Sequence, residues 1–226
     1  MRMKDSYRHL YQKSRAHLEK GEVGLAIHAL QEALQLEPDD TFIWEEIFKL
    51  CMLAGSTRNA LVAAFELRRI DENNPNYVYM HGIASLTDGQ VEAAAEILED
   101  ALRRVPRALE VRRALAQTYE ILDKPERMRE LLEEGVEQSP TEPAVVNDLA
   151  VYLLQQGEEG KRRAEPLLRR VLKVHPGDEA THLNLALVLA ERDASAARQH
   201  AQRALRSQEE SIREQAQQLL TMLGGA

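Results

Sequence analysis

The feature of this sequence that most constrains its fold is a unit of about 34 residues that repeats along the chain. Similar segments close at Pro38, Pro106, Pro140 and Pro176, and a further one closes with a small shift at Pro75. Pro106 and Pro140 are 34 residues apart, and Pro140 and Pro176 are 36 apart. Because a unit this short cannot bury its apolar face alone, the period predicts units that stack on their neighbours.

Each unit carries a small–large–small pattern that begins 12 residues before its proline. The three positions are Ala26, Leu30 and Ala33; Ala94, Leu98 and Ala101; Met128, Leu132 and Gly135; and Ala164, Leu168 and Val171. Spacings of four and then three residues place all three side chains on one face of a helix. The pattern therefore predicts a helix in the second half of each unit, with a face that a neighbouring helix can approach closely.

The first half of each unit carries a second helical stripe. Its members are Trp44, Ile47, Phe48 and Cys51; Val78, His81, Gly82 and Ser85; Arg112, Leu115, Ala116 and Tyr119; Val146, Leu149, Ala150 and Leu153; and His182, Leu185, Ala186 and Leu189. Residues suited to a left-handed turn separate the two halves at Gly21, Gly55, Gly89, Asp123, Gly157 and Asp193. These positions favour a helix end in the left-handed conformation, so we expect two antiparallel helices per unit, six times over.

These residues resemble the tetratricopeptide repeat (TPR) family, most clearly in the third unit. That unit matches the family pattern through Val78, Gly82, Gly89, Ala94, Leu98, Ala101 and Pro106. The resemblance implies an all-α fold, a right-handed α-solenoid of antiparallel helix pairs. It implies a single solenoid domain over 1–226, with repeats near 7–40, 41–74, 75–108, 109–142, 143–178 and 179–206. The first unit departs from the pattern at Lys13, Ser14 and His17, and the second has Glu72 where the proline would stand.

The last segment is predicted to be a capping helix over 208–223. Ser207 and Glu210 have capping-box spacing, in which the serine accepts from a backbone amide near Glu210. Five apolar residues then fall on one face, and Gly224 ends the helix: Ile212, Ala216, Leu219, Leu220 and Leu223. Such a helix would cover the apolar face of the last unit, which would otherwise cost about 25 cal/mol per Å² left in water.

Charge and cysteine content exclude several classes of protein. The formal net charge is −8, which opposes non-specific nucleic-acid binding, because that requires a basic footprint. The single cysteine, Cys51, cannot form an internal disulfide or a four-thiolate zinc site. No stretch approaches the roughly 18 apolar residues of a membrane span, and no signal peptide is visible. We therefore expect a cytoplasmic protein, or a periplasmic one only if a leader has been removed.

The motifs of enzymes and metal sites are missing from the sequence, so we expect no catalytic residues, cofactor or metal. Gly157-Glu-Glu-Gly160-Lys161 superficially resembles a phosphate loop, but its two glutamates would repel phosphate, and we expect a stretched interhelical turn there. The histidines are expected to fall in different units, with His81 and His182 as packed core groups. Cys51 is expected to be a small buried hydrophobe.

One basic cluster interrupts the acidic background of the chain. It consists of Lys161, Arg162, Arg163, Arg169, Arg170 and Lys173, with Glu165 among them. The favoured interpretation is the solvated outer face of a second helix. The alternative is a patch for an anionic partner, whose affinity would fall steeply with salt.

The TPR resemblance also implies a partner-binding groove lined by the first helices. The groove positions hold Phe42, Met52, Leu53, Tyr79, Met80, Ile83, Leu86, Arg113, Gln117, Val151, Leu154, Leu183 and Leu187, with Tyr11, Arg15 and Glu120 alongside. They form two apolar patches with a polar saddle between them. Apolar residues outside the core often mark binding surfaces, although some of these could instead pack between adjacent first helices.

The expected ligand is an apolar helical or extended segment of another protein. The carboxylate clamp of some TPR co-chaperones does not fit, because Glu46 occupies a clamp position and would repel a carboxylate. The leading hypothesis is thus a non-catalytic protein-interaction scaffold or adaptor, bacterial in character. The alternatives are an accessory protein for an envelope machine such as a type IV pilus, and a scaffold that assembles with copies of itself.

Overall fold

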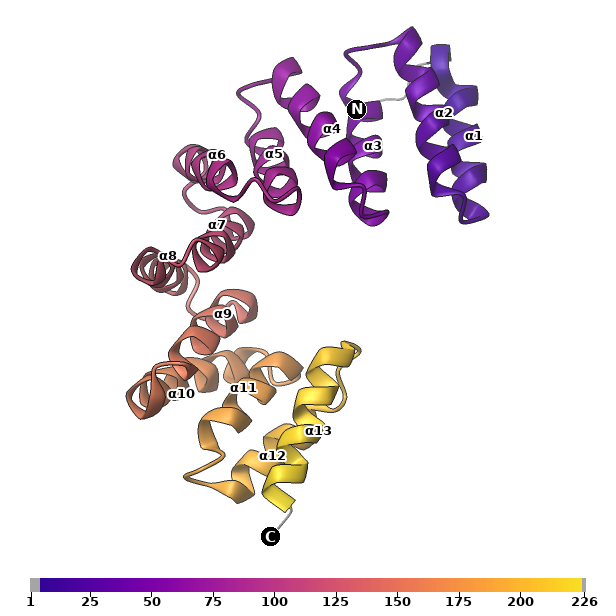
Figure 1. The fold of residues 1–226 in the computed structure, drawn as a ribbon. Coiled ribbons are helices and arrows are strands. Elements are labelled where there is room, and N and C mark those ends of the chain that lie inside the picture. The colour runs from indigo at the N-terminus through magenta and orange to yellow at the C-terminus, as the bar shows by residue number, and fades with distance from the viewer. Residues whose placement is uncertain (1–4, 225–226) are drawn as a thin grey trace. The chain divides into compact units, whose positions relative to one another are not determined.

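The computed structural model describes residues 5–224, and within that range every regular element is a helix. A short 3-10 helix (η1, Asp5–Tyr7) precedes the α-helices (Figure 1). The α-helices are α1 (Arg8–Glu19), α2 (Val23–Leu36), α3 (Thr41–Leu53), α4 (Thr57–Ile70), α5 (Pro75–Thr87), α6 (Val91–Arg104), α7 (Leu109–Ile121), α8 (Pro125–Gln138), α9 (Pro143–Leu154), α10 (Gly157–Val174), α11 (Glu179–Leu189), α12 (Ala194–Ala204) and α13 (Glu210–Gly224). The predicted all-α class is confirmed.

Consecutive helices pack against one another from α1 to α7 and from α8 to α13. Contacts join α1 to α2, α3 to α4, α5 to α6, α9 to α10 and α11 to α12, and further contacts join each pair to its neighbour within a unit. The small–large–small face supplies the close packing: Ala26, Leu30 and Ala33 are each at most 1 % exposed. In α5, a Cβ at Gly82 would lie 2.6 Å from a methyl group of Leu98, so only glycine allows this approach without a shift of that side chain.

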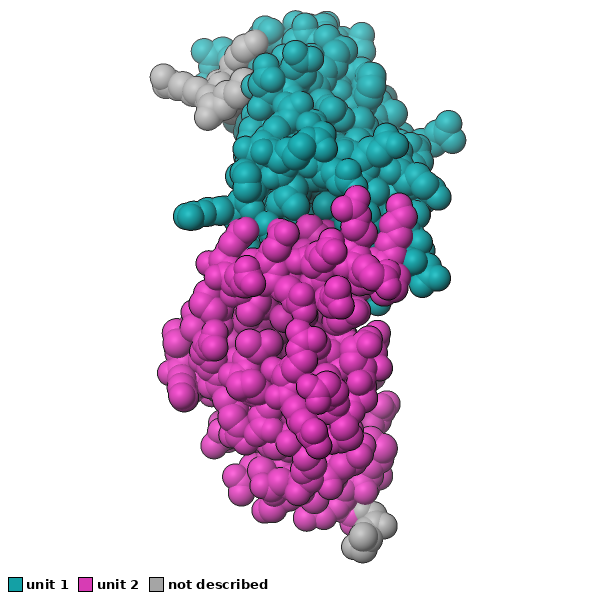
Figure 2. Space-filling model, turned by 90° about the vertical axis from the view of Figure 1, so that its left-hand side faces the viewer, with its two compact units in different colours: residues 1–123 teal, residues 124–226 magenta. Residues whose placement is uncertain are grey.

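The chain divides into two compact units, residues 1–123 and residues 124–226 (Figure 2). Unit 1 contains α1 to α7, and unit 2 contains α8 to α13. The boundary falls between the two helices of the fourth repeat, at Asp123, which has a φ of 53°. A single continuous solenoid domain over 1–226 remains a prediction.

The predicted interhelical breakers adopt the left-handed conformation at five of six positions. Gly21, Gly55, Gly89 and Gly157 have φ between 66° and 83°, and Asp123 joins them. The prediction is wrong for Asp193, whose φ is −146°. Asp193 instead caps α12, because its carboxylate accepts a hydrogen bond from the Ala196 amide at 2.9 Å.

The second helix of the fifth repeat is longer than expected. We predicted a stretched turn over residues 157–161, but α10 begins at Gly157 and includes them. Gly160 makes this possible, because a Cβ there would collide with the Leu153 carbonyl oxygen at the end of α9. Pro166 lies inside α10, where its ring nitrogen has no hydrogen to donate.

The carbonyl that ends one repeat accepts a hydrogen bond from a side chain of the next repeat. Trp44 Nε1 donates to the Pro38 carbonyl at 2.8 Å, and the Arg112 guanidinium donates to the Pro106 carbonyl at 2.9 Å. In the sixth repeat His182 Nε2 takes this role 3.1 Å from the Pro176 carbonyl.

In the third repeat a different residue donates to the equivalent carbonyl. Val78 occupies the position of Trp44 and has no polar atom to donate. The Arg104 guanidinium of α6 reaches back instead and donates to the Glu72 carbonyl at 2.7 Å. The accepting carbonyl therefore lies at the equivalent position in these repeats, whereas the residue that donates to it differs.

The C-terminal helix α13 covers the last repeat as predicted. Ala216 and Leu219 are buried against α11 and α12, and Ile212, Leu220 and Leu223 pack around them. The cap differs in detail from the capping box, since the Ser207 hydroxyl accepts from the Glu209 amide at 3.1 Å, one residue before α13 begins at Glu210.

Candidate functional site

The predicted binding residues of unit 1 lie on its first helices, α1, α3, α5 and α7. We call this set the unit 1 face: Tyr11, Phe42, Met52, Leu53, Tyr79, Met80, Ile83, Leu86, Arg113 and Gln117. Leu53 is 77 % exposed, and Gln117 is also exposed. The remaining members are half-buried. Each therefore contributes to packing and still presents surface to solvent.

Contacts connect the unit 1 face from helix to helix. The rings of Tyr11 on α1 and Phe42 on α3 have centroids 5.3 Å apart. The Thr87 hydroxyl at the end of α5 lies 3.9 Å from the Met52 sulfur on α3. These contacts link the apolar side chains of the face, which we call the row, from α1 to α3 and from α3 to α5.

The row ends in polar groups on α7. Burial raises the pKa of the Tyr79 phenol, the negative charge of Glu110 raises it further, and the positive charge of Arg113 opposes that rise. Tyr79 thus lies within electrostatic reach of both α7 side chains, and its phenol stays protonated at neutral pH. Glu110 was not among the predicted site residues, because the family positions on this helix pointed to Arg113, Gln117 and Glu120.

The predicted obstacle to a carboxylate ligand, Glu46, has a cationic partner. Lys49 forms an ion pair with Glu46 at 2.9 Å, and this hydrogen bond raises the pKa of the Lys49 ammonium against the effect of burial. An i, i+3 pair on an exposed helix contributes only about 0.2–0.5 kcal/mol. The lysine was missed because it lies outside the family's groove positions.

The predicted binding residues of unit 2 differ widely in their exposure to solvent. Val151 is 48 % exposed and Leu154 is half-buried, both on α9. Leu183 was predicted to face a partner, but it is 4 % exposed and packs in one cluster with Ala204 and Ala216. That prediction is corrected for Leu183, because α13 occupies the space that the groove pattern assigned to a ligand.

Leu187 is also partly covered by α13. It is half-buried and contacts both small clusters that α13 forms with α11 and α12. The first helices of unit 2 are also tied together by polar groups: the Asn184 side-chain amide donates to Asn147 Oδ1 at 3.0 Å, and Asn147 donates to Asp178 at 3.3 Å. Unit 2 therefore offers a partner less apolar surface than unit 1.

Family models for the tetratricopeptide repeat match residues 7–40, 79–143 and 147–212. The chain belongs to the tetratricopeptide repeat family. These matches cover most of the first-helix positions described above. Among curated proteins, none matches this TPR chain.

Several solved TPR structures have the same fold at low sequence identity. Pseudomonas aeruginosa PilF aligns with a TM-score of 0.68 at 16 % identity, over 95 % of this chain and 97 % of PilF. A TPR protein from Parabacteroides merdae aligns with a TM-score of 0.65 at 15 % identity, over 98 % of this chain and all of its own. YrrB, a TPR protein with an unusual peptide-binding site, aligns with a TM-score of 0.55 at 17 % identity, over 84 % of this chain and 98 % of YrrB.

The basic cluster of this TPR chain is largely neutralised by neighbouring carboxylates. Lys161 pairs with Glu158 at 2.9 Å and with Glu191 at 2.8 Å, and Arg163 pairs with Glu133 at 2.7 Å. Arg169 pairs with Glu165 at 2.9 Å. These contacts agree with the favoured interpretation of a solvated helix face for the first part of the cluster.

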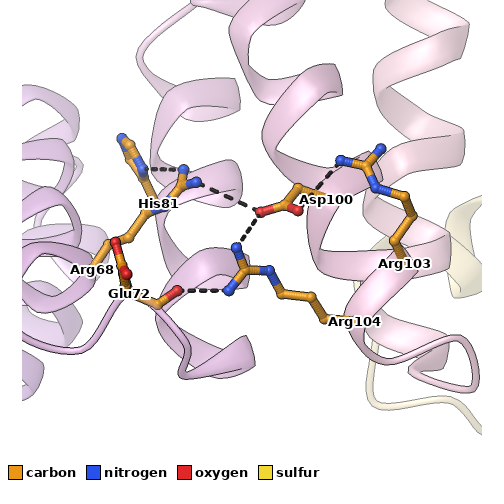
Figure 3. Close-up of polar contacts among 6 residues, drawn as sticks. All are labelled: Arg68, Glu72, His81, Asp100, Arg103 and Arg104. Atoms are coloured by element: carbon orange, nitrogen blue, oxygen red, sulfur yellow. Dashed lines mark hydrogen bonds and ion pairs between the residues drawn. The ribbon is translucent and has the colours of Figure 1, made fainter.

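A network of charged groups joins α4, α5 and α6 on the second-helix side (Figure 3). Burial raises the pKa of Asp100, but the hydrogen bond from Arg104 at 2.9 Å and nearby arginine charges outweigh it and hold the pKa below its usual range. Arg68 reaches both Asp100 at 3.6 Å and His81 Nδ1 at 3.3 Å. Because a guanidinium only donates, His81 accepts at Nδ1 and is neutral.

The structure corrects the prediction that the histidines fall in different repeats. His182 on α11 and His200 on α12 belong to one repeat, and their Nδ1 atoms are 2.8 Å apart. A search for i, i+4 pairs could not find them, because they are 18 residues apart and lie on different helices. His182 is buried as expected, whereas His81 is only partly buried.

The remaining chemical groups give no sign of catalysis. Cys51 is buried, and burial raises the pKa of its thiol, so the thiolate needed for nucleophilic attack is disfavoured. Within residues 5–224, no group of three or more histidine, cysteine or acidic residues could hold a metal ion. No helix in that range is both long and apolar enough to span a membrane.

Proposed function

We propose that this TPR chain is a non-catalytic protein-interaction scaffold, and that the unit 1 face binds an apolar helical or extended segment of another protein. The observation that carries the proposal is the set of partly or largely exposed Met, Tyr and Leu side chains on α3 and α5. Leu53 stands farthest into solvent, at 77 % exposed. Exposed contiguous apolar surface of this kind is typical of interaction sites, and Met side chains adapt to varied partners.

The chemistry of the row favours an apolar segment over a charged one. Only Arg113 supplies a formal charge within the face, at its α7 end, and it lies near Tyr79 and Glu110. A bound segment would cover Leu53, Met80 and Leu86 and would place one polar or acidic group near Arg113. The peptide-binding site of YrrB supports a peptide ligand for the same fold.

Selection of peptides from a random display library on the full chain tests this proposal. We expect enriched peptides to be apolar, and we expect Tyr79→Ala and Leu53→Glu to lower their affinity at least about tenfold, or 1.4 kcal/mol. The matched control is Phe65→Ala on α4, because Phe65 is 54 % exposed but lies on a second helix. Circular dichroism would show that each variant keeps its helicity.

The results distinguish specific binding at this face from non-specific binding of apolar peptides elsewhere on the chain. Equal loss of affinity in Phe65→Ala and Tyr79→Ala would contradict the proposal, as would peptides enriched in acidic residues with no apolar positions. Photo-crosslinking from position 53, compared with position 65, would place the bound segment directly on one surface.

Two other predicted roles remain as alternatives to this proposal. For an envelope-machine accessory, the structural likeness to PilF shows the fold alone, since the identity is 16 %. A scaffold that assembles with copies of itself would show a mass that rises with concentration in light scattering. The cytoplasmic location stays part of the proposal and is supported by the single buried cysteine.

A further inference from the structure

A second surface of unit 2 has chemistry that the partner-binding proposal does not use. A pocket of about 270 Å³ lies between α10, α11 and α12. Its lining consists of Arg169, Leu172, Lys173, Pro176, His182, Leu185, His200 and Arg203. Sites for drug-sized ligands span roughly 300–1,000 Å³, so this pocket suits a smaller group.

The rim of the pocket is cationic. Arg169 and Lys173 come from α10 and Arg203 from α12, and all three are exposed. Glu165 pairs with Arg169 at 2.9 Å and with Arg192 at 2.7 Å, and the charges of Asp178 and Glu179 act on His182. Three positive charges thus converge on one small pocket in a chain whose net charge is −8.

The floor of the pocket holds the two contacting imidazoles, whose proton positions follow from their partners. His182 Nε2 is 3.1 Å from the Pro176 carbonyl, which can only accept, so His182 carries its proton on Nε2. In neutral His182, Nδ1 then accepts, and His200 Nδ1 must donate to it across 2.8 Å. His200 Nε2 is left without a proton.

We propose that this pocket binds a tetrahedral oxyanion, the phosphate group of a free phosphate ion or of a phosphomonoester. Arg169, Lys173 and Arg203 supply donors and charge around the rim, as anion sites require. Leu172 and Leu185 supply the apolar wall that lowers the local dielectric and strengthens these interactions. The ester carbon chain of a monoester would point out past the exposed rim.

The imidazole pair would respond to such an anion. Burial, followed by the charges of His182, Arg203 and Arg169, lowers the pKa of His200 to about 4. Burial also lowers the pKa of His182; Arg203 adds to this effect, whereas the Pro176 hydrogen bond, Asp178 and Glu179 oppose it. A bound dianion would offset the arginine charges, so both imidazole pKa values should rise when the pocket is filled.

Calorimetric titration of the full chain with inorganic phosphate at low salt tests the proposal. We expect saturable binding with one site, and Lys173→Gln/Arg203→Gln should weaken it at least about tenfold. The matched control is Arg162→Gln/Arg170→Gln, which removes the same charge from exposed positions of α10 outside the pocket. This control should change the affinity less than about twofold.

Two further ligands identify the group. Phosphoserine that binds more tightly than inorganic phosphate would assign the site to a monoester, and the reverse order would assign it to the free ion; both support the proposal. Acetate that binds as tightly as phosphate would overturn the assignment to a tetrahedral oxyanion. Absence of saturable binding, or equal weakening in both double variants, would overturn the site itself.

Nuclear magnetic resonance of the histidine rings keeps the test valid if a double variant fails to fold. In the unmodified chain, saturating phosphate should raise the pKa of His182 and His200, whereas the ring resonances of His28, which is exposed on α2, should not move when phosphate is added at constant pH. Unchanged ring pKa values for the pair at saturation would contradict binding in this pocket.

Discussion

The two units use the same repeat for different ends. In unit 1 the first helices meet through a row of aromatic and thioether side chains, such as the Tyr11–Phe42 ring contact, and the row stays half-exposed. In unit 2 the corresponding helices meet through hydrogen bonds from Asn184 to Asn147, and α13 buries Leu183. A TPR unit can therefore keep its helix packing while the apolar side chains of its first-helix face change from partly exposed to buried.

The difference arises from few residues, because the core positions are alike in the two units. Leu98 in unit 1 and Leu168 in unit 2 are both fully buried at the equivalent position of the second helix. The two units differ in the side chains that the first helices direct toward one another, and in the terminal helix α13, which only unit 2 has among the described residues. Experiments on matched positions of the two units can test how independent packing and surface are.

The largest expected effect comes from adding one methyl group at a helix crossing. Gly160→Ala in unit 2 would drive a Cβ into the Leu153 carbonyl oxygen, which belongs to rigid backbone, and we expect a loss of about 3 kcal/mol or more. Gly82→Ala in unit 1 meets a Leu98 methyl at 2.6 Å, which can move, so about 1–2 kcal/mol should be lost.

Urea denaturation followed by circular dichroism would measure both changes. Gly24→Ala on α2 is the control, since nothing lies within 4 Å of its Cβ. It should be neutral or stabilise by up to about 1 kcal/mol. A smaller loss for Gly160→Ala than for Gly82→Ala would show that α10 can shift away from α9.

The cap should matter almost as much to unit 2. Leu219→Ala removes a side chain that is 3 % exposed and packs against Ala186 and Ala201, and we expect a loss of about 2–3 kcal/mol. Met222→Ala, on the same helix but 71 % exposed, should cost less than about 0.5 kcal/mol. Hydrogen exchange would show faster amide exchange in α11 and α12 for the first variant, with unit 1 unchanged.

The histidine pair should make unit 2 sensitive to mild acid. The folded pKa of His200 is about 4, below its unfolded value of about 6.5, so the unfolded chain binds the proton more readily between these pH values. The free energy of unfolding should therefore fall as the pH decreases from about 6.5 to about 4, by about 1–2 kcal/mol for this partly exposed ring.

Replacement of the ring isolates this contribution from that of the carboxylates. His200→Gln should flatten the difference in unfolding free energy between pH 7 and pH 4.5, whereas His28→Gln, at an exposed position of unit 1, should not. An identical pH dependence in both variants would mean that folding does not change the proton affinity of this histidine.

The helix caps allow a further comparison of the two units. Asp40 is 3 % exposed and accepts from the Phe42 and Ile43 amides at the start of α3, so Asp40→Ala should cost about 2 kcal/mol in unit 1. Ser207→Ala removes one bond to the Glu209 amide and should cost about 1 kcal/mol in unit 2. Thermal unfolding of the two variants would rank them, and the reverse order would contradict the importance of burial.

The sequence predicted the helices well because their signals are local and repeated. A leucine such as Leu98, with small residues four before and three after it, has the same meaning in every unit, so one weak match is supported by the others. The exceptions are particular. Gly160 resembled a turn residue because glycine ends helices, and only the position of the Leu153 carbonyl reveals that it serves a helix crossing.

The candidate site was less accessible to sequence reasoning, because exposure depends on residues far along the chain. Leu183 fits the pattern of a groove residue, and it is buried by Ala216, which lies on another helix. The contact between His182 and His200 likewise depends on how α11 and α12 are aligned rather than on any spacing. Patterns give the face on which a residue lies, but the neighbouring helix determines whether that face is open.

The hydrogen bonds to the carbonyls of Pro38, Glu72, Pro106 and Pro176 have a practical consequence for redesign of the chain. Trp44 and Arg104 satisfy equivalent carbonyls, at Pro38 and Glu72, from different helices. The donor used in one repeat should therefore work in another. Trp44→Val alone would leave the Pro38 carbonyl without its hydrogen-bond donor. Adding Ile70→Arg, at the position equivalent to Arg104, should supply a new donor. Modules of this chain can then be exchanged as long as each junction brings one donor of its own.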